Sequence, residues 1–243
     1  MRRSFRAAAV VAAAAWLTVS SARAQAPPAG ATGIKYMRDS EEYAALIRQV
    51  YRQAADAVSR RATTLAPGSW AVVLDIDETA LDNSTYQLDR VAYGLAFENT
   101  SWNAWVLRRE AGLVPGVADF VAGVRRLGGR VAWISNRDAI VGDATRANLH
   151  CVGLLAEADR VCLQEPHRTK AVRRAEIVSG NGSCAWNGTP VHVLAFVGDQ
   201  MGDFPAADEH IADAGTDDAF GRTCFLLPNS MYGEWVTKVT RRR

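Results

Sequence analysis

Short apolar runs alternate with segments of helical character along this chain, and no other feature constrains its fold as strongly. The runs that read as strands cover residues 70–74, 130–134, 161–163, 191–197 and 224–227. Helical spacing with capping signals predicts helices over about 40–64, 115–128, 138–149 and 169–178. Strands that alternate with helices of this length form a parallel sheet with helices on both faces. We therefore expect an α/β fold.

The first residues have the layout of an export signal. Three arginines within the first six residues precede an apolar run over 7–19, and the tripeptide Ala22-Arg23-Ala24 follows. This order is typical of a cleavable signal peptide, and the run is too short to span a bilayer, which disfavours an uncleaved anchor. We expect a signal peptide over 1–24, cleavage near Ala24, a flexible leader over 25–35 and a single domain over 36–243. The expected location is periplasmic or secreted, without a stable membrane anchor.

The basic excess of the chain comes from its N-terminal segment. Residues 1–24 hold four arginines and no acid, so the remaining 219 residues carry 24 basic and 26 acidic side chains. A slightly acidic mature chain gives no reason to expect a nucleic acid polymer as a partner.

All four cysteines follow the predicted signal peptide. An even number of cysteines in an exported chain favours disulfides, and no pair here has the C-x-x-C spacing of a zinc or redox site. Four cysteines allow three pairings, of which we favour Cys151–Cys162 with Cys184–Cys224. Four buried free thiols are the alternative if the chain is not exported.

Three predicted strands end in polar side chains: Asp75, Ser135 and Asp199. Ligands of open parallel sheets bind at the carboxyl ends of the strands, so these residues are expected to converge. Asp75 and Asp77 stand two apart and point the same way in an extended segment. One carboxylate of such a pair can attack phosphorus while the other transfers protons. Alone, the pair is a weak signal, because two solvated acids at a strand end have the same pattern.

Asp199 adds a third carboxylate to this edge of the sheet. Three converging carboxylates repel one another unless a cation lies among them, and ligands that are all oxygen suit Mg²⁺. Asp203 follows four residues later and is also a candidate cap for a helix start.

Other residues near the predicted strand ends suit a phosphate group. Ser135 and Asn136 offer a hydroxyl and backbone N–H groups. Lys170 begins a predicted helix, where the helix dipole favours anions, and it can neutralise charge on a transferring phosphoryl group. Arg168 and Arg173 are nearby competitors for that role.

Four motifs in this order carry a family resemblance. They are Asp75-Ile-Asp-Glu-Thr-Ala-Leu-Asp-Asn83 with Ser84 and Tyr86, Trp133-Ile-Ser-Asn-Arg137, Val197-Gly-Asp-Gln-Met-Gly-Asp-Phe204 and Leu227-Pro-Asn-Ser-Met-Tyr-Gly-Glu-Trp235. The set resembles the haloacid dehalogenase superfamily and, more narrowly, the class C bacterial acid phosphatases of its subfamily IIIB. The resemblance extends from about residue 36 to residue 236.

The resemblance implies a Rossmann-like sheet with a small, mostly helical cap, whose elements we expect around 36–65 and 82–112. It implies a secreted, magnesium-dependent phosphatase that hydrolyses phosphomonoesters through an aspartyl phosphate. The resemblance implies that Asp75 is the nucleophile and that Asp77 is the general acid and base. It implies that Mg²⁺ binds to the side chains of Asp75 and Asp199 and to the backbone carbonyl of Asp77, with Asp203 near the water ligands of the metal. It also implies that Ser135, Asn136 and Lys170 bind the phosphate.

In the resembling family, aromatic side chains at the mouth of the site hold the base of a nucleotide. The candidates in this chain are Tyr232 first and Tyr86 second, with Trp102, Trp105 and Trp235 also present. Ordinary packing is the alternative for two or three of them. The expected substrates are small aromatic monoesters and nucleoside monophosphates, with a 5′-nucleotidase bias, and homodimer formation is left open.

This chain departs from the family pattern in two respects, and two other functions compete. It lacks the lipid-bearing cysteine of many members, and Gln200 stands where asparagine is usual. The first alternative is a non-catalytic storage or binding protein, and the presence of Asp75 disfavours it. A dehalogenase or phosphonate hydrolase is the second, which the acid at Asp77 disfavours.

Overall fold

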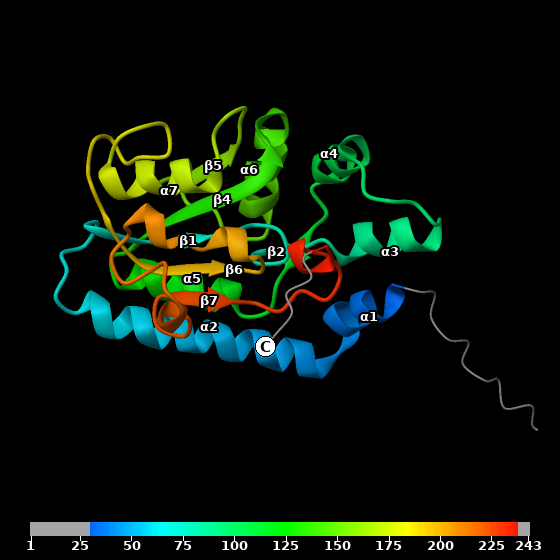
Figure 1. Ribbon diagram of the computed structural model, residues 1–243, viewed down its shortest axis with the longest axis horizontal. Coiled ribbons are helices and arrows are strands. Elements are labelled where there is room, and N and C mark those ends of the chain that lie inside the picture. Colours follow the sequence, from blue (N-terminus) through cyan, green and yellow to red (C-terminus); the bar gives the residue numbers. More distant parts are fainter. Residues whose placement is uncertain (1–29, 238–243) are drawn as a thin grey trace, which may run out of the picture.

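Five parallel strands form the central sheet of the computed structural model, which describes residues 30–237 (Figure 1). The strands lie in the order β5-β4-β1-β6-β7, and each neighbouring pair is parallel. Their bounds are β1 Trp70–Leu74, β4 Arg130–Asp138, β5 Arg160–Gln164, β6 His192–Gly198 and β7 Cys224–Leu226. Each lies where an apolar run predicts it, so the expected α/β fold is confirmed.

Helices cover both faces of this sheet. Their bounds are α2 Glu41–Ala62, α5 Val117–Arg126, α6 Gly142–Cys151 and α7 Lys170–Ser179. Side chains of β1 alternate between the faces, as a strand requires. Val72 and Leu74 pack with α2 and α5, whereas Ala71 and Val73 pack on the opposite face with Ile177 of α7. Figure 1 shows α2 and α5 on one side of the strands and α7 on the other.

The long helix α2 begins at a capped serine, as its sequence predicts. Ser40 Oγ accepts a hydrogen bond from the Tyr43 backbone N–H at 3.0 Å. Buried residues such as Ile47 and Tyr51 recur on one face of the helix, which packs against α5 and β6. We expected cap elements around 36–65, but the structure places α2 in the layer of helices that covers the sheet.

A two-helix insertion stands apart from the sheet (Figure 1). It contains α3 Ser84–Ala92 and α4 Asn99–Arg108. At its base β2 Leu81–Asp82 pairs antiparallel with β3 Gly112–Leu113. The chain therefore leaves and re-enters the core at adjacent points, and this insertion occupies the part of the expected cap around 82–112.

The chain ends are only partly described. The predicted signal peptide and residues 25–29 of the predicted leader lie outside the described residues. Residues 31–35 of that leader belong to α1 Ala31–Asp39, which packs against α2 and α3, so the prediction of a flexible leader is wrong for these residues. Within residues 30–237, no helix has the length and apolar character needed to cross a membrane. Short 3-10 turns cover Ala139–Val141, Met201–Asp203, Ala207–Glu209, Asp217–Ala219 and Glu234–Val236.

Candidate active site

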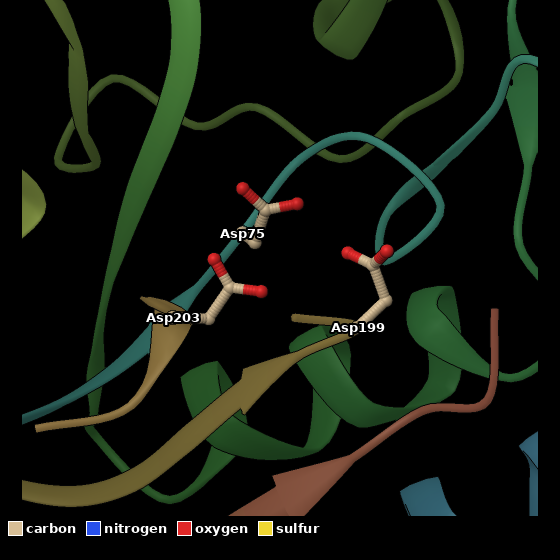
Figure 2. A group of neighbouring side chains, drawn as sticks. All are labelled: Asp75, Asp199 and Asp203. Carbon is tan, nitrogen blue, oxygen red and sulfur yellow. The ribbon is translucent and has the colours of Figure 1, made fainter. Parts of the chain in front are cut away.

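The carboxyl ends of the central strands bring three buried carboxylates together. Asp75 follows β1, Asp199 follows β6, and Asp203 lies in the turn after β6. One carboxylate oxygen from each lies within 4.8 Å of the others. Figure 2 shows the three side chains pointing into one shared space. The convergence predicted from the strand ends is therefore present, and Asp203 belongs to the cluster itself.

A lysine ammonium pairs with two of these carboxylates. Lys170, the first residue of α7, donates from Nζ to Asp75 Oδ1 at 2.5 Å and also to Asp203 Oδ1. Burial lowers the pKa of Lys170, but the charges of Asp75 and Asp203 outweigh burial and raise it above its ordinary value. Lys170 therefore stays charged at the centre of the site.

The competing arginines have other partners. Arg168 pairs with Glu165 and with Glu176 of α7. Arg173 donates to the Ser135 backbone carbonyl at 2.6 Å and to Asn136 Oδ1 at 3.0 Å. Arg173 thus supports the two residues predicted to bind phosphate rather than replacing Lys170.

The cluster carries more negative than positive charge. Burial raises the pKa of Asp75 well above its usual range; Lys170 opposes that shift, and the neighbouring carboxylates add to it. Burial likewise raises the pKa of Asp199 to about 6. A divalent cation would relieve this repulsion, and three buried carboxylates provide the oxygen ligands that a hard cation prefers. The donor set of this chain therefore fits the expected metal.

Arg137, for which the sequence predicted no role, holds the Asp77 carboxylate. Arg137 is fully buried and donates to Asp77 Oδ1 from Nε at 2.9 Å and from Nη2 at 2.8 Å. Ser135 Oγ donates to Asp77 Oδ2 at 3.2 Å, and Asn83 Nδ2 donates to Oδ1 at 3.0 Å. Arg137 stands two residues after Ser135 in β4, on the same side of the strand. The two-residue spacing could have predicted that Arg137 points toward the site, where a buried arginine needs an anionic partner.

The insertion contacts the groups that hold Asp77. Trp105 of α4 donates from Nε1 to Asn83 Oδ1 at 2.8 Å. The Arg137 guanidinium lies 5.8 Å from the ring centroid of Trp102, which is also in α4. Through these contacts, the orientation of Asp77 depends on the position of α4.

Buried polar groups also shape the turn between β1 and the insertion. Glu78 adopts a left-handed backbone conformation with φ 55° and accepts from the Asn83 N–H at 2.9 Å. Tyr51 of α2 donates to the Thr79 carbonyl at 2.7 Å. Helix α2 thus supports the floor of the site from below. In the sequence, only the polar pair Glu78-Thr79 after Asp77 indicates that this turn needs hydrogen-bond partners.

A cavity of about 730 Å³ opens over the carboxylates. Its walls include Phe97 and Trp102 from the insertion and Tyr232 from the C-terminal segment. Tyr232 therefore lies where we predicted a leaving-group contact. Tyr86 does not line the cavity: it is buried, its hydroxyl lies 2.9 Å from Ser101 Oγ, and its ring packs edge-on against Trp102. The assignment of Tyr86 is wrong because its side chain points away from the cavity and packs against Trp102.

The disulfide pairing differs from the favoured one. Cys162 of β5 is bonded to Cys184, in the loop after α7, while Cys151 is an exposed free thiol and Cys224 a buried one. Cys224 lies on β7, at the opposite sheet edge from β5, so Cys184 cannot reach it. Cys151 ends α6, which packs through Leu149 on one face, while Cys162 points to the other. Both predicted pairs are therefore wrong.

Comparisons with known proteins agree with this geometry. A family model described as HAD superfamily, subfamily IIIB (acid phosphatase), matches residues 3–235. The structure of the class C acid phosphatase from Bacillus anthracis is 28% identical, with a TM-score of 0.71, over 85% of this chain and 86% of that one. The tungstate-bound structure of the class C acid phosphatase from Bacillus anthracis is 29% identical, with a TM-score of 0.70 and the same coverage. The chain belongs to the subfamily IIIB acid phosphatases of the haloacid dehalogenase superfamily, which are phosphomonoester hydrolases.

Proposed function

We propose that this protein is an exported phosphatase that hydrolyses small phosphomonoesters through an aspartyl phosphate on Asp75. The observation that carries the proposal is the position of Asp75: its buried carboxylate lies at the cavity floor, paired with Lys170 and two residues from Asp77. The predicted signal peptide and the Cys162–Cys184 disulfide support export to an oxidising compartment.

Two steps follow from this arrangement. In the first, a carboxylate oxygen of Asp75 forms a bond to phosphorus, the bond to the ester oxygen breaks, and Asp77 gives that oxygen its proton. In the second, Asp77 takes a proton from water, whose oxygen attacks phosphorus. The bond to Asp75 then breaks, which releases inorganic phosphate and restores the carboxylate. Arg137, Ser135 and Asn83 hold Asp77 in position for both transfers.

The remaining residues bind and neutralise the phosphoryl group. Ser135, Asn136 and Lys170 would hold its oxygens, and the Lys170 ammonium would offset charge that develops during transfer. Asp75, Asp199 and the Asp77 carbonyl would hold Mg²⁺, with Asp203 beside it, and a bound Mg²⁺ would add a positive charge next to the phosphoryl oxygens.

The walls of the cavity favour an aromatic leaving group. Phe97, Trp102 and Tyr232 present apolar rings around an opening that is large enough for a nucleoside. Stacking of a base on one aromatic ring is worth about 1–3 kcal/mol. We therefore propose aromatic monoesters and nucleoside monophosphates as preferred substrates, with weak discrimination among bases.

Phosphate release from a panel of monoesters tests the proposal. Wild-type protein with Mg²⁺ should release phosphate, chelator should stop the reaction, and added Mg²⁺ should restore it. Asp75→Asn should remove nearly all turnover, because an amide cannot form the acyl phosphate. Retention of about a tenth of the activity by this variant would refute the covalent mechanism. Absence of turnover in the wild type would favour the storage or binding function.

A further inference from the structure

A C-terminal segment, residues 228–236, lies along the mouth of the site, and we call it the C-terminal strap. Its first half is fixed to the core and to α1. Leu227, directly before the strap, donates its N–H to the Gly198 carbonyl at 2.8 Å, and Ser230 Oγ in the strap donates to the Gly33 carbonyl at 2.9 Å. Its second half carries Tyr232, which lines the cavity. What holds this second half therefore affects the leaving-group wall.

The strap is joined to one carboxylate of the metal cluster. Asp199 Oδ2 accepts from Asn229 Nδ2 at 2.8 Å and from Gln200 Nε2 at 2.7 Å. Its other oxygen, Oδ1, lies 3.4 Å from Thr79 Oγ1. The hydrogen bonds from Asn229 and Gln200 therefore both depend on the orientation of the Asp199 carboxylate.

Gln200 extends that link into the second half of the strap. Its Nε2 also donates to the Tyr232 carbonyl at 3.3 Å, and its Oε1 accepts from the Glu234 N–H at 3.1 Å. Gly233 lies between them, and a Cβ there would come within 2.6 Å of Gln200 Oε1, so glycine allows this approach. Gln200 therefore bridges Asp199 and two backbone groups of the strap.

The length of glutamine is what makes the bridge. Asparagine is shorter by one carbon–carbon bond, about 1.5 Å. The side-chain amide of an asparagine would lie closer to the backbone by that distance. It could not hydrogen-bond to both Asp199 and the Glu234 N–H, because at least one of the two donor–acceptor distances would exceed hydrogen-bonding range. An asparagine at this position could therefore not join the strap to Asp199 as Gln200 does.

We propose that Gln200 couples cation binding to the strap, so that a divalent cation held by Asp75 and Asp199 orders residues 232–236 and completes the leaving-group wall. This inference rests on the metal site of the proposed function. Repulsion within the cluster opposes any single orientation of the Asp199 carboxylate, and a bound cation removes that repulsion. The fixed carboxylate holds Gln200, and Gln200 holds the backbone on both sides of Gly233. Gln200 is a positioning residue that acts through the strap.

Hydrogen exchange of the full chain, with Mg²⁺ as the added ligand and no substrate present, measures this coupling directly. In wild type, Mg²⁺ should slow amide exchange in 232–236 about fivefold, the effect of one net hydrogen bond. Gln200→Asn keeps the amide and shortens its reach, while Gln200→Met keeps the length and removes the hydrogen bonds. Both variants should lose the Mg²⁺-dependent slowing. Gln53→Asn, on the exposed side of α2, is the control and should behave as wild type.

Calorimetric titration with Mg²⁺ and phosphate release from a monoester accompany the exchange measurement. The inference is overturned if Mg²⁺ binds but does not slow exchange in the wild-type strap, or if both Gln200 variants keep the slowing. It is also overturned if Mg²⁺ does not bind, a result that removes the metal from the proposed function as well. Loss of phosphate release alone, with the exchange pattern intact, refutes the proposed function and leaves the coupling standing.

Discussion

Replacement of Arg137 by methionine should impair the enzyme in a way that depends on the leaving group. Arg137 is fully buried and gives Asp77 two of its four hydrogen-bond donor groups, while Ser135 and Asn83 supply the others. Arg137→Met leaves the Asp77 carboxylate in place but removes the planar fork that orients it. Proton transfer to the departing oxygen should therefore suffer most.

The structure sets the expected size of this effect. Breaking a buried ion pair by removing one partner costs about 3–5 kcal/mol of stability. A general acid contributes about 10²–10⁴ in rate, and misplacement by about 1 Å can cost 10²-fold. We expect kcat/KM for glycerol phosphate to fall about 100-fold. Dinitrophenyl phosphate needs no proton on its leaving group, so its kcat/KM should fall by less than about fivefold.

Two further variants separate positioning from general damage. Arg137→Lys keeps the charge without the fork and should fall between wild type and Arg137→Met. Arg125→Met breaks the ion pair with Asp159 at the amino end of β5, away from the catalytic strand ends, so it should lower the urea midpoint without changing the ratio of the two esters. Equal losses of kcat/KM for both esters in Arg137→Met would show that Arg137 has only a structural role.

Three further predictions concern the metal, the thiols and the insertion. Because burial raises the pKa of Asp199 to about 6, protons compete with the cation below that pH. Mg²⁺ affinity should therefore fall about tenfold per pH unit below it in calorimetric titrations, and affinity that is flat with pH would contradict this. In unreduced native protein, Cys151 should be alkylated readily, whereas Cys224 should stay unmodified until denaturation because burial raises its pKa to about 11; mass spectrometry checks both. Trp102→Ala should reduce the preference for a nucleoside monophosphate over glycerol phosphate about tenfold, from loss of stacking, and an unchanged kcat/KM ratio would exclude Trp102 from the leaving-group wall.

Much of the architecture was predictable because local patterns determine it. Each sheet strand is a short apolar run that is buried on both faces, and parallel order brings the strand ends together. Asp75 and Asp199 could therefore be placed side by side from their positions alone. The helix Ser84–Ala92 was missed because it is short and mostly exposed, with only Ser84 and Tyr86 buried.

What could not be predicted depends on distances across the sheet. The Cys162–Cys184 bond requires knowing which cysteines share an edge and a face, and sequence separation carries neither. The pairing of Arg137 with Asp77 joins residues 60 positions apart, one in β4 and the other in the turn after the neighbouring strand β1. Tyr86 and Trp102 look equivalent as aromatic residues of the same insertion, yet only the packing of α3 against α4 decides which one faces the cavity.

The short β2–β3 pair at the base of the insertion makes this insertion an exchangeable segment. Leu81 pairs with Leu113 and Asp82 with Gly112, so the chain between them begins and ends at one point on the core. A segment of different length or shape could be grafted there without moving β1 or the carboxylates behind it. A graft that keeps Asn83, Trp102 and Trp105 would retain the contacts to Asp77 and Arg137. Engineering of this enzyme toward other esters can therefore exchange the rest of the insertion while the phosphate chemistry stays unchanged.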